Sequence, residues 1–114
     1  LNVNCQSIMA RNQALSQLTA DSKPNIIIAN ETWLTENHGI AEILISDGYV
    51  IERRDRERHS HGGVIIAVKK TLIATRESEL ETDCEIMWCK LKLAGKKTMH
   101  IGAFYRPHEN DKTH

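Results

Sequence analysis

The sequence predicts an α+β protein built on one mixed β-sheet, which begins with a βαβ unit and continues with mostly antiparallel strands. Three observations predict this class. Residues 1–30 have the pattern of a strand, a helix and a strand; four more strand-like segments follow; and only one segment has clear helical spacing. A crossover through a helix makes the flanking strands parallel, whereas strands joined by short turns pair antiparallel.

The βαβ unit begins with residues 1–4, in which apolar side chains share one face and two asparagines share the other. Its second strand is predicted over residues 26–30, a β-branched run without alternation, which is typical of a strand buried on both faces. Because the two strands are expected to be parallel, Asn4 and Glu31 should emerge at the same carboxyl edge of the sheet. Open α/β sheets bind their ligands at this edge.

The helix between these strands is predicted from three apolar residues at helical spacing, Ile8, Leu15 and Leu18. Its start has two candidates, Ser7 and Asn12, because either side chain can cap a helix. It should end before Pro24, since proline and the residue before it resist helical geometry.

The four later strands are predicted over residues 49–54, 63–69, 84–93 and 99–105. A hairpin turn over residues 94–97 joins the last two. The third of these strands is apolar on both faces, with Met87, Cys89 and Leu91 on one and Ile86 and Trp88 on the other. Two apolar faces predict a sheet covered on both sides, although the chain offers only one obvious helix to cover it.

The composition fits one domain and excludes several classes of protein. The chain has 114 residues, 15 Lys+Arg against 15 Asp+Glu, and 40% apolar residues. This balance excludes a disordered acidic tail, a histone-like basic arm and a secreted disulfide scaffold. The longest apolar runs, residues 26–29 and 64–68, are far shorter than the ~20 residues of a membrane-spanning helix, and the start of the chain lacks the pattern of a secretory leader. We therefore expect an intracellular protein without a membrane partner, whose three cysteines are reduced.

Polar side chains lie where the two parallel strands end. Glu31 closely follows four apolar residues, and a carboxylate there is costly to desolvate unless it is paired. Its partner is a basic side chain, a turn that it caps, or a metal ion, and the sequence leaves all three open. Asparagine is a poor strand former, so Asn2 and Asn4 on one face indicate either a polar task for that face or an edge strand wetted by solvent.

The chain carries five short motifs in order: Leu1-Asn2-Val3-Asn4, Asn30-Glu31-Thr32-Trp33-Leu34, Arg53-Arg54-Asp55-Arg56, the glycine pair Gly62-Gly63 before the apolar run 64–68, and Phe104-Tyr105-Arg106-Pro107. In this order and spacing they resemble the first half of the endonuclease-exonuclease-phosphatase superfamily. The second and fifth motifs most resemble the apurinic-type endonuclease domain of retrotransposons that lack long terminal repeats. The resemblance covers essentially the whole chain.

The resemblance implies that residues 1–114 are the amino-terminal half of such a domain, and therefore half of a four-layer α/β sandwich. Two similar sheets pack face to face in this superfamily, and we expect the chain to supply only the first sheet, with its inner face bare. Soluble monomers tolerate only a few hundred Å² of contiguous apolar surface, so the chain alone is expected to be aggregation-prone or molten.

The resemblance also implies site residues. Glu31 matches the glutamate that holds the catalytic Mg²⁺, for which Mn²⁺ can substitute. Asn2 matches an asparagine that helps to place the scissile phosphate, and Tyr105 matches a tyrosine that hydrogen-bonds the phosphate region. Asn2, Glu31 and Tyr105 are therefore the predicted catalytic residues. Asn4 falls close to the metal in many relatives, and we expect Asn4 and Arg106 to bind the substrate.

The activity implied is that of a Mg²⁺-dependent endonuclease, which hydrolyses a phosphodiester bond to nick target DNA for retrotransposition. The implied partners are DNA, the missing carboxyl-terminal half of the domain, and a reverse transcriptase domain downstream, with a nuclear location when the enzyme acts on DNA. Basic residues within 53–58, together with Lys69 and Lys70, either rest on the DNA backbone or lie in solvated loops.

Two alternatives stay open. The Gly-Asp-Phe-Asn segment and the closing Asp-His pair of the superfamily do not occur in this sequence, so the chain holds half an active site and is expected to be inactive alone. The first alternative is an inactive remnant or a weak nucleic-acid-binding fragment. The second is a phosphatase or phosphodiesterase of the same superfamily, acting on inositol phosphates or sphingomyelin, against which the residues at 33–34 and 106–107 argue.

Overall fold

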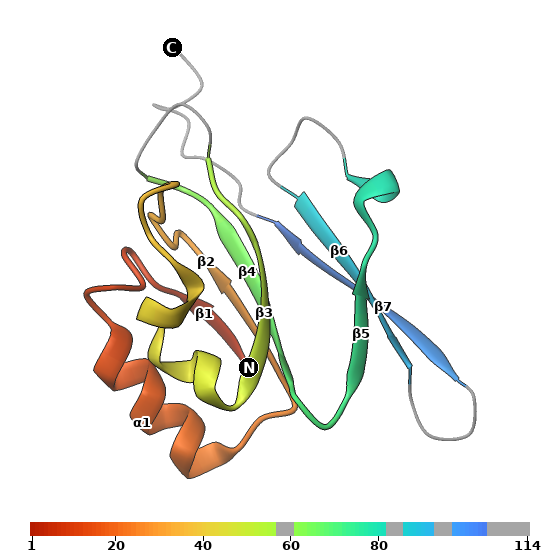
Figure 1. The fold of residues 1–114 in the computed structure, drawn as a ribbon, viewed down its shortest axis with the longest axis horizontal. Helices are drawn as coiled ribbons and strands as arrows, with labels where there is room; N and C mark the ends of the chain where they lie inside the picture. The colour runs from red at the N-terminus through yellow and green to blue at the C-terminus, as the bar shows by residue number, and fades with distance from the viewer. Residues whose placement is uncertain (57–60, 82–85, 93–96, 105–114) are drawn as a thin grey trace.

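The computed structural model describes residues 1–56, 61–81, 86–92 and 97–104, which form two β-sheets and one α-helix (Figure 1). The first part of the chain contains β1 (Asn2–Asn4), α1 (Asn12–Ser22), β2 (Ile26–Asn30), β3 (Tyr49–Arg54) and β4 (Val64–Lys69), with two 3-10 turns, η1 (Ile40–Glu42) and η2 (Leu44–Asp47). The second part contains β5 (Ile73–Arg76), η3 (Ser78–Leu80), β6 (Ile86–Lys92) and β7 (Thr98–Phe104).

The first sheet has four strands in the order β1-β2-β4-β3. The pair β1 and β2 is parallel, with Asn4 opposite Asn30, and both pairs that involve β4 are antiparallel. A parallel pair joined through α1 is a βαβ unit. The predicted α+β class, with a mixed sheet and a βαβ start, is therefore confirmed.

One feature of the predicted sheet needs correction. The later strands do not extend the first sheet but form a second, antiparallel sheet in the order β5-β6-β7. The physical reason is that the apolar side chains on one face of β6 and β7 are buried against β4, so this sheet stacks on the first one. The sequence does not predict strand β5, because its four residues carry little apolar alternation. In the structure two of them are exposed.

Each face of the first sheet has its own hydrophobic cluster, so the molecule has three layers (Figure 1). Helix α1 and η2 cover one face, and the second sheet covers the other. Strand β4 contributes to both clusters, with Ile65 and Ala67 in the first and Val64, Ile66 and Val68 in the second. A strand buried on both faces fixes the position of its ends, and one end of β4 borders the site described below.

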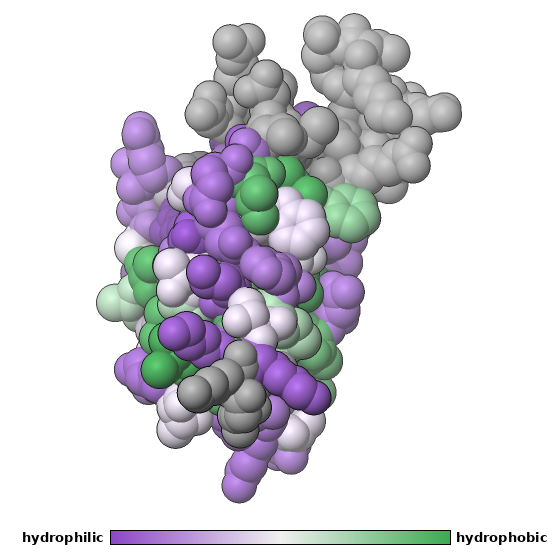
Figure 2. Space-filling model, turned by 90° about the vertical axis from the view of Figure 1, so that its right-hand side faces the viewer, coloured by the Kyte–Doolittle hydropathy of each residue, from purple (hydrophilic) through white to green (hydrophobic). Residues whose placement is uncertain are grey.

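The face expected to be bare is covered. Met87, Cys89 and Leu91 are at most 1% exposed because they pack between the two sheets. The opposite, outward face of the second sheet carries half-buried Trp88 and Phe104, which is 64% exposed. Figure 2 shows this side of the molecule, with apolar side chains gathered near its upper end among hydrophilic ones.

Helix α1 begins at Asn12, but neither candidate side chain caps it. The Ser7 hydroxyl accepts a hydrogen bond of 3.2 Å from the Ala10 amide in the turn before the helix. The Asn12 side chain instead donates to the Glu42 carbonyl at 2.7 Å and accepts from the Leu44 amide at 2.9 Å. These two bonds fasten the helix start to the 3-10 turns.

The buried stripe of α1 also differs from the predicted one. Leu15 is buried as expected, but Leu18 is 43% exposed and Thr19 is buried in its place. The side chain of Thr19 can be buried because its hydroxyl donates to the Ser16 carbonyl at 2.9 Å. Within the described residues, no helix has the length and apolar character needed to cross a membrane.

Candidate active site

Left-handed backbone conformations gather at one edge of the four-stranded sheet. Of the seven described residues with positive φ, six lie there: Gln6 (43°) and Ser7 (84°) after β1, Glu31 (50°) and Trp33 (56°) after β2, and Gly62 (90°) and Gly63 (87°) before β4. Residues other than glycine adopt this conformation at a cost, and such residues cluster at functional sites. We call this part of the molecule the strained edge.

Backbone hydrogen bonds hold residues 31–33 between the turn after β1 and the turn before β4. Four of them, of 2.9–3.3 Å, run from Ser7 N to Glu31 O, from Ile8 N to Thr32 O, from Thr32 N to Gly63 O and from Trp33 N to Gly62 O. The ring of Trp33 also packs against that of His61, with 4.3 Å between the ring centroids. The strained edge is therefore fixed by the fold rather than by local preference.

Glu31 lies in the middle of this edge. The residue is 7% exposed, so most of its surface is removed from bulk water. Its backbone carbonyl accepts a hydrogen bond from Ser7, which fixes the main chain beneath the carboxylate. A buried carboxylate held on a strained backbone is a feature of functional sites rather than of surface loops.

The asparagines of β1 lie on the face that looks toward the second sheet. Val3 packs into the cluster on the helix side, and side chains alternate along a strand, so Asn2 and Asn4 lie on the opposite face. Both are exposed, and Asn4 is opposite Asn30 in the parallel pair. The structure therefore brings together Asn4, Asn30 and Glu31, with Asn2 two residues further along β1.

Three polar side-chain atoms at the strained edge have no hydrogen-bond partner although they are buried. They are Asn30 Oδ1, Thr32 Oγ1 and Trp33 Nε1, and the described residues contain no other such atom. All three belong to residues within two positions of Glu31. Buried polar atoms without partners are rare in native proteins, so each of these three atoms needs a physical explanation.

The strained edge continues into the second sheet. Asn30 is opposite Val64 in β4, and Val64 is opposite Arg54 in β3. The Arg54 guanidinium donates to the Ile86 carbonyl at 2.7 Å, and Ile86 is opposite Phe104 in β7. The end of β7 therefore lies at the same end of the molecule as Glu31. Tyr105 and Arg106, the predicted catalytic and substrate-binding residues that follow Phe104, lie outside the described residues, as do residues 94–96 of the predicted hairpin turn.

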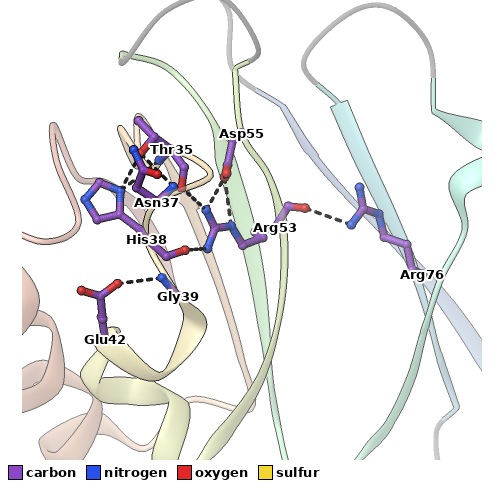
Figure 3. Close-up of polar contacts among 8 residues, drawn as sticks. All are labelled: Thr35, Asn37, His38, Gly39, Glu42, Arg53, Asp55 and Arg76. Carbon is purple, nitrogen blue, oxygen red and sulfur yellow. Dashed lines mark hydrogen bonds and ion pairs between the residues drawn. The ribbon is translucent and has the colours of Figure 1, made fainter.

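Arg53 fixes the loop that follows Glu31 (Figure 3). Its guanidinium donates to the carbonyls of His38 (2.6 Å) and Thr35 (2.8 Å) and makes two bonds to Asp55, of 3.1 and 2.5 Å. Its own carbonyl accepts a bond of 3.0 Å from Arg76 of the second sheet. Arg53 is therefore a structural residue and does not belong to the basic residues available to a DNA backbone. Sequence reasoning missed this role, since a basic run gives no sign of which arginine makes hydrogen bonds within the protein.

Lys69 and Lys70 lie at the far end of β4 from Glu31. Lys69 is opposite Tyr49, at the start of β3, and its amide donates to the Asn25 carbonyl just before β2. These lysines do not border the strained edge.

Ion pairs and thiols elsewhere have structural roles. Arg76 and Glu81 make a bidentate pair, with bonds of 2.5 and 2.8 Å, and the hydrogen bonds from Arg76 lower the pKa of Glu81. Burial raises the pKa of Cys5 and of Cys89 to about 11, so both thiols are neutral near pH 7 and poor nucleophiles. Among the described residues, no three His, Cys, Asp or Glu side chains gather as a metal site.

No protein-family model matches the sequence, and no curated protein matches it. Several solved structures share the fold. An AP endonuclease from Leishmania major is 20% identical, with a TM-score of 0.70 over 91% of this chain and 38% of its own. The endonuclease domain of TRAS1, a telomere-specific non-LTR retrotransposon, is 14% identical, with a TM-score of 0.66 over 98% of this chain and 46% of its own.

The catalytic domain of APE2 from Xenopus laevis is 16% identical, with a TM-score of 0.67 over 97% of this chain and 46% of its own. The chain thus spans less than half the length of each of these structures. Its three layers share the fold of these structures, which belong to the endonuclease-exonuclease-phosphatase superfamily.

Proposed function

We propose that this chain is part of a Mg²⁺-dependent DNA endonuclease, which nicks target DNA by hydrolysing a phosphodiester bond. One observation supports the proposal: Asn4 is opposite Asn30, and Asn30 directly precedes buried Glu31 at the strained edge of a fold shared with known nucleases. A retrotransposon endonuclease is among the structures that share this fold. By the same resemblance, the nick would prime a reverse transcriptase domain of the same parent protein in the nucleus.

The residues at the strained edge fit a divalent cation. Mg²⁺ prefers carboxylate and carbonyl oxygens, binds one or two carboxylates, and keeps several water ligands. Glu31 supplies a carboxylate, the neighbouring asparagines supply amide oxygens, and Asn30 Oδ1 is buried without a partner. Glu31 would hold the cation with Asn4 close to it, and Mn²⁺ would substitute for Mg²⁺.

Glu31 would hold a cation whose positive charge would polarise the phosphoryl group and stabilise the leaving 3′ oxygen. The amides of Asn2 and Asn4 donate hydrogen bonds that orient the scissile phosphate, because both lie on the exposed face of β1. Tyr105 would donate a hydrogen bond to charge that develops on the phosphate, as in an oxyanion hole. Arg106 would contribute a positive charge next to it.

A complete site needs groups that this sequence lacks. Neither the Gly-Asp-Phe-Asn segment nor the Asp-His pair of the superfamily occurs in the 114 residues, and the matching structures are more than twice as long. We therefore propose that a carboxyl-terminal half completes the domain and that residues 1–114 alone do not cleave DNA. The outward face of the second sheet, with Phe104 64% exposed, provides a surface for that half.

The test is nicking of supercoiled plasmid with Mg²⁺ by the parent protein that contains residues 1–114, compared with its Glu31→Gln variant. We expect the variant to lose nicking while it keeps the unfolding temperature of the parent. Nicking at the parental rate, with unchanged cation affinity, would overturn the assignment of Glu31. Cleavage of inositol phosphates or sphingomyelin in place of DNA would favour the phosphodiesterase alternative.

A further inference from the structure

Asn30 borders the strained edge, and the resemblance assigns no role to its side chain. It ends β2, directly before Glu31, and its Oδ1 is buried with no hydrogen-bond partner among the described residues. Along the sheet it is opposite exposed Asn4 on one side and buried Val64 on the other. A buried amide oxygen without a partner has lost its water and gained nothing from the protein, so it needs an explanation.

The usual explanation is a turn, in which an asparagine side chain accepts a bond from a backbone amide two residues ahead. This explanation fails here because the amides ahead are already used. The Thr32 amide donates to the Gly63 carbonyl at 3.3 Å and the Trp33 amide donates to the Gly62 carbonyl at 2.9 Å. The backbone carbonyl of Asn30 is also satisfied, by the Cys5 amide at 2.9 Å. Among the described residues, no backbone amide next to Asn30 is therefore left to donate to Oδ1, which stays available as an acceptor.

We propose that Asn30 belongs to the cation site, where its side-chain oxygen accepts a hydrogen bond from a water molecule of the hydrated Mg²⁺ held at Glu31. This inference rests on the proposed function. Mg²⁺ dehydrates reluctantly and keeps several waters, whose hydrogens need acceptors. Groups that accept from metal-bound ligands orient them and support metal affinity. A neutral amide oxygen supplies such an acceptor without placing a second negative charge beside buried Glu31.

The test is cation binding by the parent protein that contains residues 1–114, measured with Mn²⁺ alone by the relaxation rate of water protons and with Mg²⁺ alone by the shift in unfolding temperature. Four variants are compared with the wild-type chain: Asn30→Ala, Asn30→Asp, Glu31→Gln and Asn25→Ala. Asn25 is the matched control, because it is an exposed asparagine just before the opposite end of β2.

We expect Asn30→Ala to weaken Mn²⁺ binding about tenfold or more, as for other residues that hold metal ligands. It should leave the unfolding temperature without cation unchanged or higher, because it removes an acceptor that has no partner. Its Mg²⁺-induced temperature shift should shrink accordingly. Asn30→Asp should keep the wild-type affinity or exceed it, and Asn25→Ala should match the wild-type chain in every measurement.

Two results overturn the inference alone: wild-type affinity in Asn30→Ala while Glu31→Gln loses binding, or a lower unfolding temperature of cation-free Asn30→Ala. The first shows that the cation binds without Asn30, and the second shows that Asn30 has a protein partner. A wild-type chain that binds neither cation, or binds them equally well as Glu31→Gln, overturns both this inference and the proposed cation site.

Discussion

The Thr32 amide donates a hydrogen bond of 3.3 Å to the Gly63 carbonyl, and a Cβ added to Gly63 would lie 2.6 Å from Thr32 Oγ1. Thr32 is fully buried, so its hydroxyl has little room to move away. Gly63 also has a φ of +87°, which side-chain-bearing residues rarely adopt. The glycine thus permits the close approach that holds the residue after Glu31 against β4.

We expect Gly63→Ala to lower the free energy of unfolding by about 2–4 kcal/mol, because left-handed strain and overpacking both act at this position. Thermal unfolding of the two chains measures the loss. Gly48→Ala is the matched control, since its φ is −112° and a Cβ there has no atom within 4 Å. The control should change stability by no more than about 0.5 kcal/mol. Equal effects of the two substitutions would contradict the role given to Gly63.

Arg53→Lys should loosen the loop after Glu31. Lysine keeps the charge but lacks the planar five-donor fork that reaches two carbonyls and a carboxylate in fixed directions, so the carbonyls of Thr35 and His38 lose hydrogen bonds. We expect a loss of about 1–3 kcal/mol and faster amide hydrogen exchange over residues 35–39. Hydrogen exchange read by mass spectrometry measures this directly. The exposed Arg11 gives the control Arg11→Lys, and unchanged exchange in Arg53→Lys would mean that the loop is held by other contacts.

Acid should weaken the link between η3 and β5. The pKa of Glu81 is lowered in the folded protein, chiefly by hydrogen bonds from Arg76. Because the pKa is lower in the folded protein, the ionised pair stabilises the fold at pH values above the ordinary glutamate pKa of about 4.5. This stabilisation is lost as the pH falls through the folded pKa. Urea unfolding between pH 7 and pH 3 should therefore show a fall in stability that is shallower in Glu81→Gln. Glu79→Gln, at an exposed glutamate of η3, should keep the steeper fall.

The outward face of the second sheet should drive association of residues 1–114. Phe104 is 64% exposed and Ile73 is 67% exposed, whereas the inner face is buried against β4. We therefore expect cooperative unfolding together with concentration-dependent association, which sedimentation velocity measures. Phe104→Lys should shift the chain toward monomer. Leu18→Lys, at a 43% exposed leucine of α1, should leave the association unchanged. Loss of association in Leu18→Lys but not in Phe104→Lys would place the associating surface on the helix.

Local patterns in the sequence determined the elements that begin the chain and the edge where they end. The β-branched run of β2 and the alternation of β1 predict two strands, because each pattern depends on neighbouring residues alone. The helix between them predicts that the two strands are parallel, as they are. Parallel strands end at one edge of a sheet, so the sequence alone predicts that Asn4 and Glu31 lie at the same edge. The superfamily resemblance rested on these residues together with three later motifs, and the expected fold is confirmed by the solved structures that match.

The tertiary structure alone decided which sheet the later strands join. Met87, Cys89 and Leu91 were correctly placed on one face of a strand, but alternation does not say what that face packs against. Pairing among β5, β6 and β7 turned that face onto β4 and buried it. For a similar reason Leu18 is exposed and Thr19 is buried, contrary to the prediction, since the elements packed against a helix decide which of its sides is buried.

The details of the candidate site were also set by tertiary contacts. In the sequence Arg53 is one of several basic residues. Only the tertiary structure shows that its guanidinium donates hydrogen bonds to the loop after Glu31. In the sequence Asn30 is the last residue of a predicted strand. Only the tertiary structure shows that the amides of Thr32 and Trp33 donate to Gly63 and Gly62, and that Asn30 Oδ1 has no partner among the described residues. Hydrogen bonds between residues about 30 positions apart depend on long-range register, which local spacing does not encode. The sequence therefore predicted where Glu31 lies, and the tertiary structure decided which of its neighbours remain available to a ligand.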